Sequence, residues 1–329
     1  MDLARRLLLA LLVAGLTLAA LAVVTNAATN PPTFVRVFAA PGTFPGYVKS
    51  PEGMCFDAAG NILVADRSNN RIQKFDTNGA LLLNFGTMGI GNGQFTDPDD
   101  VGIDAAGNIY VMNESNSRVQ KFDAAGNFLK TWGSYGALPG QFDSARGLWV
   151  QADGTVWVAD RANQRIEKFD SEGNLLHIWG TPGSQPGQFN DPRDLAIDAN
   201  GDIFVLDRRN YRVQHFDSAL NYINQWGGRG TLPDQFTYMR GIALDGLGHV
   251  YVADGDAIRI SKWDYQGNLL SEWSGPAGEI PWIEPRGLLA DTNGNVYVAD
   301  YSANRIYLYH FGPSAVSERS WGEVKELYR

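Results

Sequence analysis

"ILVADRSNNRI", residues 62–72, decides the fold because the same arrangement returns along the chain. An apolar run ends in an acid or an amide, a polar loop follows, and an arginine with a β-branched neighbour comes next. The six copies place this arginine at Arg71, Arg118, Arg165, Arg212, Arg259 and Arg305. Their spacings are 47, 47, 47, 47 and 46 residues. Repeats of this size indicate a solenoid or a propeller rather than independent domains.

Each repeat contains four strand-like segments joined by two kinds of turn. In the fourth repeat the segments are residues 194–197, 203–206, 212–216 and 222–226. Short turns such as "DAAGN" at 104–108 give up-and-down hairpins, whereas loops such as "GTPGSQPGQFNDP" at 180–192 are longer. Four antiparallel strands in a radial array form a propeller blade. The pattern therefore predicts an all-β, six-bladed β-propeller of four-stranded antiparallel blades.

The repeated residues resemble NHL repeats. The resemblance rests on the "VAD" run, the "NRI" that follows it, and a "GQF" and "P-x-G" lead-in, and it covers residues 33–311. The repeats depart from the pattern at Asn113, at residues 256–258 and around Trp282. The resemblance implies a six-bladed ring. It implies little about activity, because the family includes binding scaffolds as well as enzymes.

The spacing also predicts how the ring closes. Phe38 lies 13 residues before Pro51, the same separation as between Phe85 and Pro98. Residues 34–38, "FVRVF", are therefore predicted to be the outermost strand of the sixth blade. The competing segment, residues 317–321, ends 16 residues after Arg305 where other repeats use 14. The predicted domain is a propeller over residues 33–311, followed by a tail at 312–329 whose role the sequence leaves open.

Residues 1–28 have the character of an export segment. Two arginines precede an uncharged apolar run of 18 residues at 7–24, and small and polar residues follow it. The segment is expected to be an N-terminal hydrophobic helix that is either a signal peptide that is cleaved or an anchor that stays in the membrane. Either alternative places the propeller outside the cytoplasm, secreted or membrane-anchored, with membrane contact only through this segment.

The charge and the cysteine content restrict the partners and the source of stability. The net charge is −9, and removing residues 1–27 takes away two arginines and one aspartate and makes it −10. A nucleic-acid partner requires a basic surface, so none is expected. Cys55 is the only cysteine, so an intramolecular disulfide is excluded. Packing must stabilise the chain, which is expected to be a monomer.

The longer loops all emerge at one end of the predicted ring, and that end is the expected binding surface. The first residues of each innermost strand line the mouth of the central channel there. The first position is occupied by Glu52, Asp99, Arg146, Arg193, Arg240 and Arg286, and the next position adds the carboxylates of Asp100 and Asp194. Such arginines bind carboxylate or phosphate groups. The alternative is that they pair with acids and carbonyls of neighbouring blades.

A second set of candidates follows the acid of each repeat, where the loop residue varies. The set is Arg67, Glu114, Arg161, Arg208 and Tyr301, with a glycine in the fifth repeat. Variation at a fixed scaffold position is how repeat proteins build a specific surface, so these residues are candidate partner contacts or simply solvated side chains. Asp66 and Arg71, in contrast, recur in most blades and are predicted to bridge the second and third strands.

Signs of catalysis are few. His177, His215, His249 and His310 fall on outer strands or near the short turns, away from the channel mouth. A zinc site needs several imidazoles together, which weighs against the histidine-bound metal that a resemblance to amidating lyases would imply. The mouth carboxylates could hold Ca²⁺ but more simply neutralise the arginines. No catalytic residue and no cofactor are therefore expected.

The leading hypothesis is a non-enzymatic binding scaffold that holds a protein, peptide or glycan through its loop-rich face and channel mouth. The alternative is a metal-dependent lyase or lactone hydrolase, similar to amidating lyases or gluconolactonases, with its site at the central channel.

Overall fold

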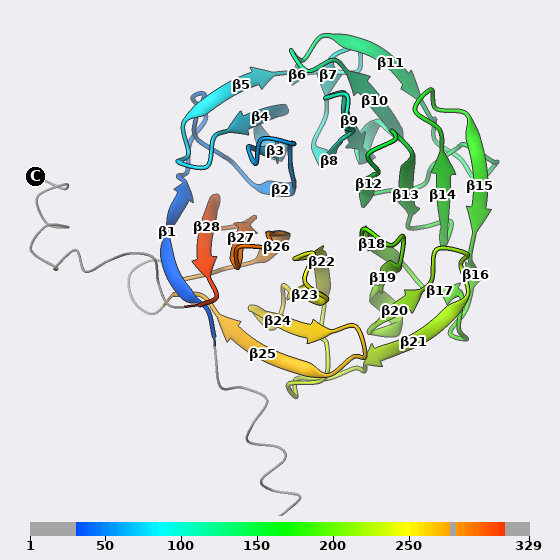
Figure 1. Ribbon diagram of the computed structural model, residues 1–329. Coiled ribbons are helices and arrows are strands. Elements are labelled where there is room, and N and C mark those ends of the chain that lie inside the picture. Colours follow the sequence, from blue (N-terminus) through cyan, green and yellow to red (C-terminus); the bar gives the residue numbers. More distant parts are fainter. Residues whose placement is uncertain (1–30, 277–280, 313–329) are drawn as a thin grey trace, which may run out of the picture.

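The computed structural model describes residues 31–276 and 281–312, and these residues form a closed ring of six four-stranded sheets (Figure 1). Within each sheet every neighbouring pair of strands is antiparallel. The predicted all-β, six-bladed propeller of four-stranded antiparallel blades is therefore confirmed. The export segment predicted at 1–28, the competing strand at 317–321 and almost all of the predicted tail lie outside the described residues.

The first three blades run from the channel outward as follows. Blade 1 consists of β2 (Pro51–Phe56), β3 (Ile62–Asp66), β4 (Arg71–Phe75) and β5 (Leu81–Phe85). Blade 2 consists of β8 (Pro98–Ile103), β9 (Ile109–Asn113), β10 (Arg118–Phe122) and β11 (Phe128–Trp132). Blade 3 consists of β12 (Leu148–Val150), β13 (Val156–Asp160), β14 (Arg165–Phe169) and β15 (Leu175–Trp179).

The other three blades follow the same order. Blade 4 consists of β18 (Pro192–Ile197), β19 (Ile203–Asp207), β20 (Arg212–Phe216) and β21 (Tyr222–Gly227). Blade 5 consists of β22 (Met239–Leu244), β23 (His249–Asp254), β24 (Arg259–Asp264) and β25 (Leu269–Ser274). Blade 6 consists of β26 (Pro285–Ala290), β27 (Asn295–Asp300), β28 (Arg305–His310) and β1 (Thr33–Ala39).

Small elements decorate the long loops. Two-stranded parallel pairs lie in two of the loops that lead into the next blade: β6 (Thr87–Met88) with β7 (Gln94–Phe95), and β16 (Thr181–Pro182) with β17 (Gln188–Phe189). Single 3-10 turns follow the second strand of three blades: η1 (Arg67–Asn69), η2 (Glu114–Asn116) and η3 (Arg208–Asn210).

Burial explains the composition of the strands. The second strand of each blade is sandwiched between neighbouring blades, so its side chains are covered on both faces, as in β3 and β13. The outermost strand faces solvent on one side, and β5 is largely exposed. The hydrophobic core consists of clusters that each join two adjacent blades, for example Leu63 and Ile72 against Val111 and Phe122. Each blade thus depends on its neighbours for burial.

The two ends of the ring meet in blade 6. β1 pairs antiparallel with β28, with Thr33 opposite His310 and Phe34 opposite Tyr309. The ring of Phe38 packs edge-on against Tyr297 of blade 6 and Phe75 of blade 1, with ring centroids 5.1 and 5.9 Å apart. The segment predicted as the outer strand at 34–38 therefore lies in β1. β1 contributes side chains to the hydrophobic clusters on both of its sides and so joins blade 6 to blade 1.

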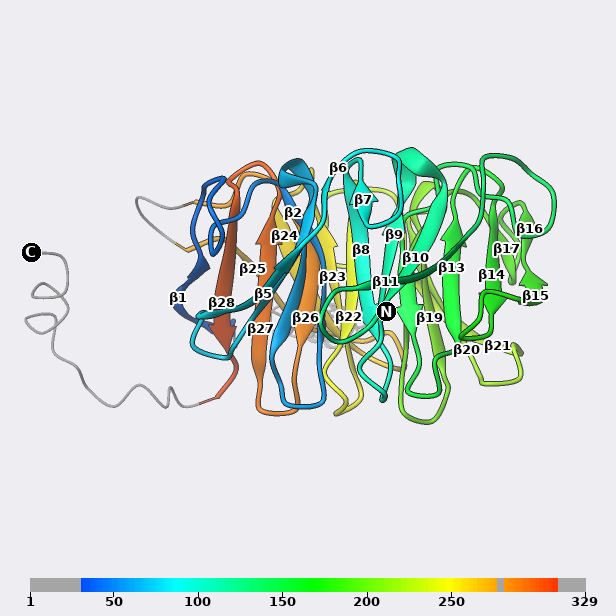
Figure 2. The ribbon, with the colours of Figure 1, turned by 90° about the horizontal axis from the view of Figure 1, so that it is seen from above.

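The two ends of the ring differ in their turns (Figure 2). At the tight-turn end, an aspartate accepts hydrogen bonds from the backbone of its own hairpin. Asp57 Oδ1, for example, accepts from the amides of Ala59 and Asn61, both at 2.9 Å. Gly60 in this turn has φ +81°, in the left-handed region that favours glycine. The beginning of β1 and the end of β28 lie at this tight-turn end.

The other end, called the mouth end here, carries the long loops, and the repeated arginine holds them in place. Arg71 Nε lies 2.7 Å from Asp66 Oδ2, and its terminal nitrogens donate to the carbonyls of Thr43, Phe44 and Tyr47. Arg165 forms the same bridge to Asp160 at 2.9 Å. The predicted bridge between the second and third strands is therefore confirmed, and the guanidinium group also fixes the preceding loop.

Candidate functional site

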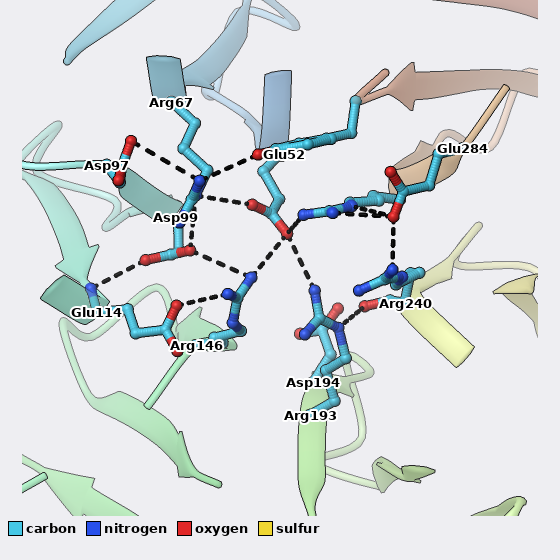
Figure 3. Close-up of polar contacts among 12 residues, drawn as sticks. Glu52, Arg67, Asp97, Asp99, Glu114, Arg146, Arg193, Asp194, Arg240 and Glu284 are labelled. Atoms are coloured by element: carbon cyan, nitrogen blue, oxygen red, sulfur yellow. Dashed lines mark hydrogen bonds and ion pairs between the residues drawn. The ribbon is translucent and has the colours of Figure 1, made fainter. Parts of the chain in front are cut away.

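A cavity of about 300 Å³ occupies the central channel and is lined by the inner strands of all six blades. The charged side chains that line it are the eight predicted for the channel mouth: Glu52, Asp99, Asp100, Arg146, Arg193, Asp194, Arg240 and Arg286. The structure thus brings this predicted set together around one opening. Figure 3 shows Glu52, Asp99, Arg146, Arg193, Asp194 and Arg240 of this set.

Glu52 is the centre of the charged network at the mouth. Its Oε1 accepts hydrogen bonds from Arg146 and Arg286 at 3.1 Å each and from Arg193 at 3.0 Å. Its Oε2 lies 3.3 Å from Arg67 Nε. Four guanidinium groups from four blades therefore share one carboxylate, which is itself 7% exposed. Charge-assisted bonds of this kind are among the stronger ones in proteins.

The five candidate loop residues fold inward and join the same network. Arg67 donates to Asp99 Oδ1 at 3.2 Å, and Glu114 pairs with Arg146 at 2.6 Å. Arg208 is buried and forms an ion pair with Asp191. The guanidinium carbon of Arg286 lies 3.4 Å from the centre of the Tyr301 ring, and Arg161 Nε lies 3.0 Å from Asp191. The two predicted sets therefore form one continuous network.

Several members of this network were missed in the sequence. Glu284 pairs with both Arg240 and Arg286, and Asp191 pairs with Arg161, Arg208 and Arg209. The ring of Tyr238 lies under the guanidinium groups of Arg208 and Arg240, at 4.4 and 4.1 Å. All three missed residues stand two positions before the first mouth position of their repeats. The same register counting could have found them.

The glycine in the fifth variable loop also has a role. A Cβ on Gly255 would lie 2.8 Å from Arg240 Cγ. Glycine at this position therefore leaves the room in which the Arg240 side chain lies over Tyr238 and reaches Glu284.

Asp100 and Asp194 lie one position deeper and serve the backbone. Asp100 Oδ2 accepts from the Leu148 amide of the next blade at 2.8 Å, and Asp194 Oδ2 accepts from the Ile242 amide at 3.1 Å. The other oxygen of each carboxylate accepts from the amide that follows it in the chain. These two aspartates thus tie inner strands together. Within the described residues neither carboxylate forms an ion pair with an arginine, in contrast to the prediction that the mouth carboxylates neutralise the arginines.

The buried acids of the mouth differ in proton affinity. Burial opposes ionisation of Glu52, but the guanidinium groups of Arg146, Arg193 and Arg286 outweigh it and lower the pKa. Burial, followed by the nearby Glu52 carboxylate, raises the pKa of Asp99 to about 7. Burial also raises the pKa of Asp194 to about 7, and burial with the Asp194 charge raises that of Asp100 well above its ordinary value. Glu52 is therefore the acid that stays charged.

Below the charged layers the channel is apolar. The third position of every inner strand carries a buried apolar side chain: Met54, Val101, Leu148, Leu195, Ile242 and Leu288. Cys55 and Trp149 at the fourth position and Phe56 and Leu244 at the fifth also line the cavity. The channel is thus amphipathic along its axis, with the charge confined to the mouth.

The histidines do not contribute to this site. His177 lies on outer strand β15, His215 on β20, His249 at the start of β23 and His310 at the end of β28. Among residues 31–276 and 281–312, no three histidine, cysteine, aspartate or glutamate side chains come close enough to hold a metal ion together. Over these same ranges, no helix has the length and apolar character needed to cross a bilayer.

Comparison with known proteins gives a family match and many structural neighbours. The NHL repeat model matches residues 49–75 and 189–216, which hold the first three strands of blades 1 and 4. No curated protein sequence matches the chain. A streptogramin B lyase structure aligns with a TM-score of 0.59 and 14% identity over 84% of this chain and 97% of that one.

Two further neighbours illustrate the range of activities on this fold. A catalytically inactive virginiamycin B lyase from Staphylococcus aureus, solved with quinupristin, aligns at TM-score 0.57 and 12% identity, covering 81% of this chain and 85% of that one. A chain of a nidogen/laminin complex aligns at TM-score 0.57 and 16% identity, covering 74% of this chain and 85% of that one. At such identities the similarity establishes the fold alone.

The closed ring of four-stranded sheets defines the chain as a six-bladed β-propeller. The NHL repeat model matches two of these blades, as the sequence resemblance predicts, and the same sequence pattern recurs in the other four.

Proposed function

We propose that this propeller is a binding scaffold, exported from the cytoplasm, that holds an anionic group of a protein, peptide or glycan at its mouth end. The observation that carries the proposal is the convergence of arginines on one opening. They come from all blades except the second: Arg67, Arg146, Arg161, Arg193, Arg208, Arg240 and Arg286. Guanidinium groups are well suited to bind carboxylate, sulfate or phosphate groups because they offer planar, paired donors.

The rim between blades 3 and 4 offers the most accessible of these donors. One carboxylate, Asp191, is shared there by Arg161, Arg208 and Arg209. The side chain of Arg209 is 70% exposed and that of Arg161 is 23% exposed. A groove of about 190 Å³ lies beside them, lined by Arg161, Ala162, Gln164, Asn190, Asp191 and Arg209. Arg161 also lies 3.7 Å from Glu114, so three cations meet two carboxylates at this rim and positive charge remains for a partner.

The test is a binding experiment with the full chain as bait in extracts of the source cells. The variant Arg161→Glu/Arg209→Glu reverses charge at the rim, and Lys130→Glu reverses an exposed charge on outer strand β11 as the matched control. Arg193 is 3% exposed, so its reversal would disturb folding. We expect partners that the wild type and the control retain to be lost with the rim variant. Partners retained equally by all three proteins would contradict the proposed face.

The second candidate function is a metal-dependent lyase or lactone hydrolase at the channel. The observation in its favour is the pair of cavity carboxylates, Asp99 and Asp194, whose pKa values burial raises to about 7, which suits groups that exchange protons at neutral pH. A Ca²⁺ ion beside either carboxylate would need water or backbone oxygens to complete its shell. Metal analysis of the purified protein, with thermal shift on adding Ca²⁺ or Zn²⁺, tests this candidate, and no response would count against it.

A further inference from the structure

Glu52 occupies the mouth as an external carboxylate would. Its Oε1 accepts hydrogen bonds from three guanidinium groups at 3.0–3.1 Å. This is one more donor than the oxygen has lone pairs. The equivalent residue in blade 2, Asp99, does not contact Arg193 or Arg286, because its shorter side chain stays near its own strand and pairs with Arg67 and Arg146. Glu52 alone fills the centre of the arginine ring.

The arginines around Glu52 have donors left over. Among the described residues, the buried Nε atoms of Arg146 and Arg240 have no hydrogen-bond partner. The side chains of Arg146, Arg240 and Arg286 are 17%, 13% and 11% exposed, so solvent reaches the ring from the mouth. Unpaired buried donors are rare in folded proteins, so these two nitrogens remain available to an acceptor that enters when Glu52 moves.

The wall beneath the ring is of the opposite character. The side chains of Met54, Leu148 and Ile242 form part of the apolar layer directly below the charged residues. The cavity of about 300 Å³ lies at the lower end of the size range of small-molecule sites. A molecule with one anionic head and a short apolar body matches both layers, with its head at the arginines and its body in the channel.

We propose that the channel is a binding site for a small carboxylate with an apolar body, and that the Glu52 carboxylate is its resident competitor. The ligand carboxylate takes the place of Glu52 among Arg146, Arg193 and Arg286, and the apolar body enters the layer of Met54 and Leu148. The proposal deepens the proposed function, because it names a ligand class for the same mouth. Glu52 then sets the affinity of the site, since it must leave before the ligand enters.

The experiment is a thermal-shift and calorimetric titration of the full chain with sodium acetate, butyrate, hexanoate and octanoate. In Glu52→Ala the ring lacks its internal carboxylate, so we expect hexanoate to bind at least about tenfold more tightly than to the wild type, in which the open state is a small fraction. Affinity should rise about fourfold for each CH2 that the channel buries and stop rising once the cavity is full.

Two controls separate this site from general anion effects. Glu167→Ala removes another buried acid, one that pairs with Arg165 and does not line the cavity, and it should show no carboxylate response beyond that of the wild type. Hexanol and hexylammonium should not replace hexanoate. If Glu52→Ala responds no more than the wild type, if Glu167→Ala responds equally, or if hexanol acts as well as hexanoate, the proposal is wrong.

A second variant covers the case in which Glu52→Ala does not fold. Glu52→Gln keeps the size of the side chain and removes its charge, and it should also bind hexanoate more tightly than the wild type does. Equal binding by the two proteins would overturn the proposal. Loss of the partner from the rim variant together with no hexanoate response would leave the proposed scaffold function standing and reject the ligand class alone.

Discussion

The mouth end and the tight-turn end of the ring use the same residue types in different ways. At the tight-turn end a carboxylate such as Asp57 binds amides two and four residues away, so each hairpin stabilises itself. At the mouth end Glu52 binds arginines 94, 141 and 234 residues away. Contacts at the tight-turn end therefore stabilise individual blades, whereas contacts at the mouth end connect different blades to one another. Substitutions at the mouth should therefore affect the whole ring.

The largest effect is expected for Glu52→Gln. The change leaves four guanidinium groups around a neutral amide, and breaking a buried ion pair by removing one partner costs about 3–5 kcal/mol of unfolding free energy. Urea unfolding followed by tryptophan fluorescence measures the effect. The tight-turn control is Asp264→Asn, where an exposed carboxylate caps its own hairpin through Asn268. If Asp264→Asn lost as much unfolding free energy as Glu52→Gln, the difference inferred between the two ends of the ring would be wrong.

The next effect concerns glycines at the two ends. A Cβ on Gly287 would lie 1.8 Å from the Glu52 carbonyl oxygen, which belongs to the backbone of the neighbouring blade and cannot move aside. We expect Gly287→Ala to lower the unfolding free energy by about 3 kcal/mol. At Gly60, in contrast, the nearest atom lies at 4.0 Å and only the left-handed φ opposes a side chain.

Gly60→Ala should accordingly lower the unfolding free energy by only about 1 kcal/mol. Denaturation of both variants in the same buffer, with Gly228→Ala as a substitution into open space, gives the ranking. Equal losses at Gly287 and Gly60 would show that the inner strands do not meet as closely as the structure has them.

The smallest expected effect is a pH dependence of the unfolding free energy, which comes from a buried acid on a third strand, Glu167. Burial raises the pKa of Glu167 to about 7, and its neighbour Asp160 adds to the shift while Arg165 opposes it. Because the folded pKa lies above the ordinary value of 4.5, the folded state holds the proton more tightly. This contribution to stability is fully present below about pH 4.5 and is lost as pH rises through about 7.

Glutamine occupies the equivalent position in blades 1, 2 and 4. In blade 1, Gln73 donates to the Tyr47 carbonyl and to Asp66. Glu167→Gln should therefore stabilise the protein by about 1 kcal/mol at pH 8 and flatten the decline of stability between pH 5 and 8. Thermal unfolding over this pH range measures both. If Glu167→Gln kept the pH profile of the wild type, another group would cause the decline of stability, and Asp99 would be the next residue to substitute.

The sequence allowed the ring and the mouth residues to be predicted because both depend on register. A repeat of 47 residues places equivalent positions at equivalent points of the ring, so Glu52 and Arg286 could be put at one opening from their numbers alone. The same counting extends to the apolar layer at Met54 and its equivalents, and to Glu284 two positions before Arg286.

The contacts within the mouth could not be predicted, because they depend on side-chain length and direction. Glu52 reaches the centre of the ring because its side chain has one more CH2 than that of Asp99. Counting positions in the repeat does not reveal this difference. The inward turn of Arg67 and Arg208 depends on the 3-10 turns η1 and η3 in which they stand. Asp100 and Asp194 were expected among the arginines, yet they bind amides because the adjacent inner strand comes so close.

The pairing of β1 with β28 has a mechanical consequence. Thr33, where the chain enters the ring, lies opposite His310, where it leaves, so a force applied between these two points pulls both strands from the same end. Hydrogen bonds between antiparallel strands run across the strands, and under such a load they would open one after another, like a zipper. The ring would yield at its outermost seam first, at low force, while the mouth and its arginines stayed assembled.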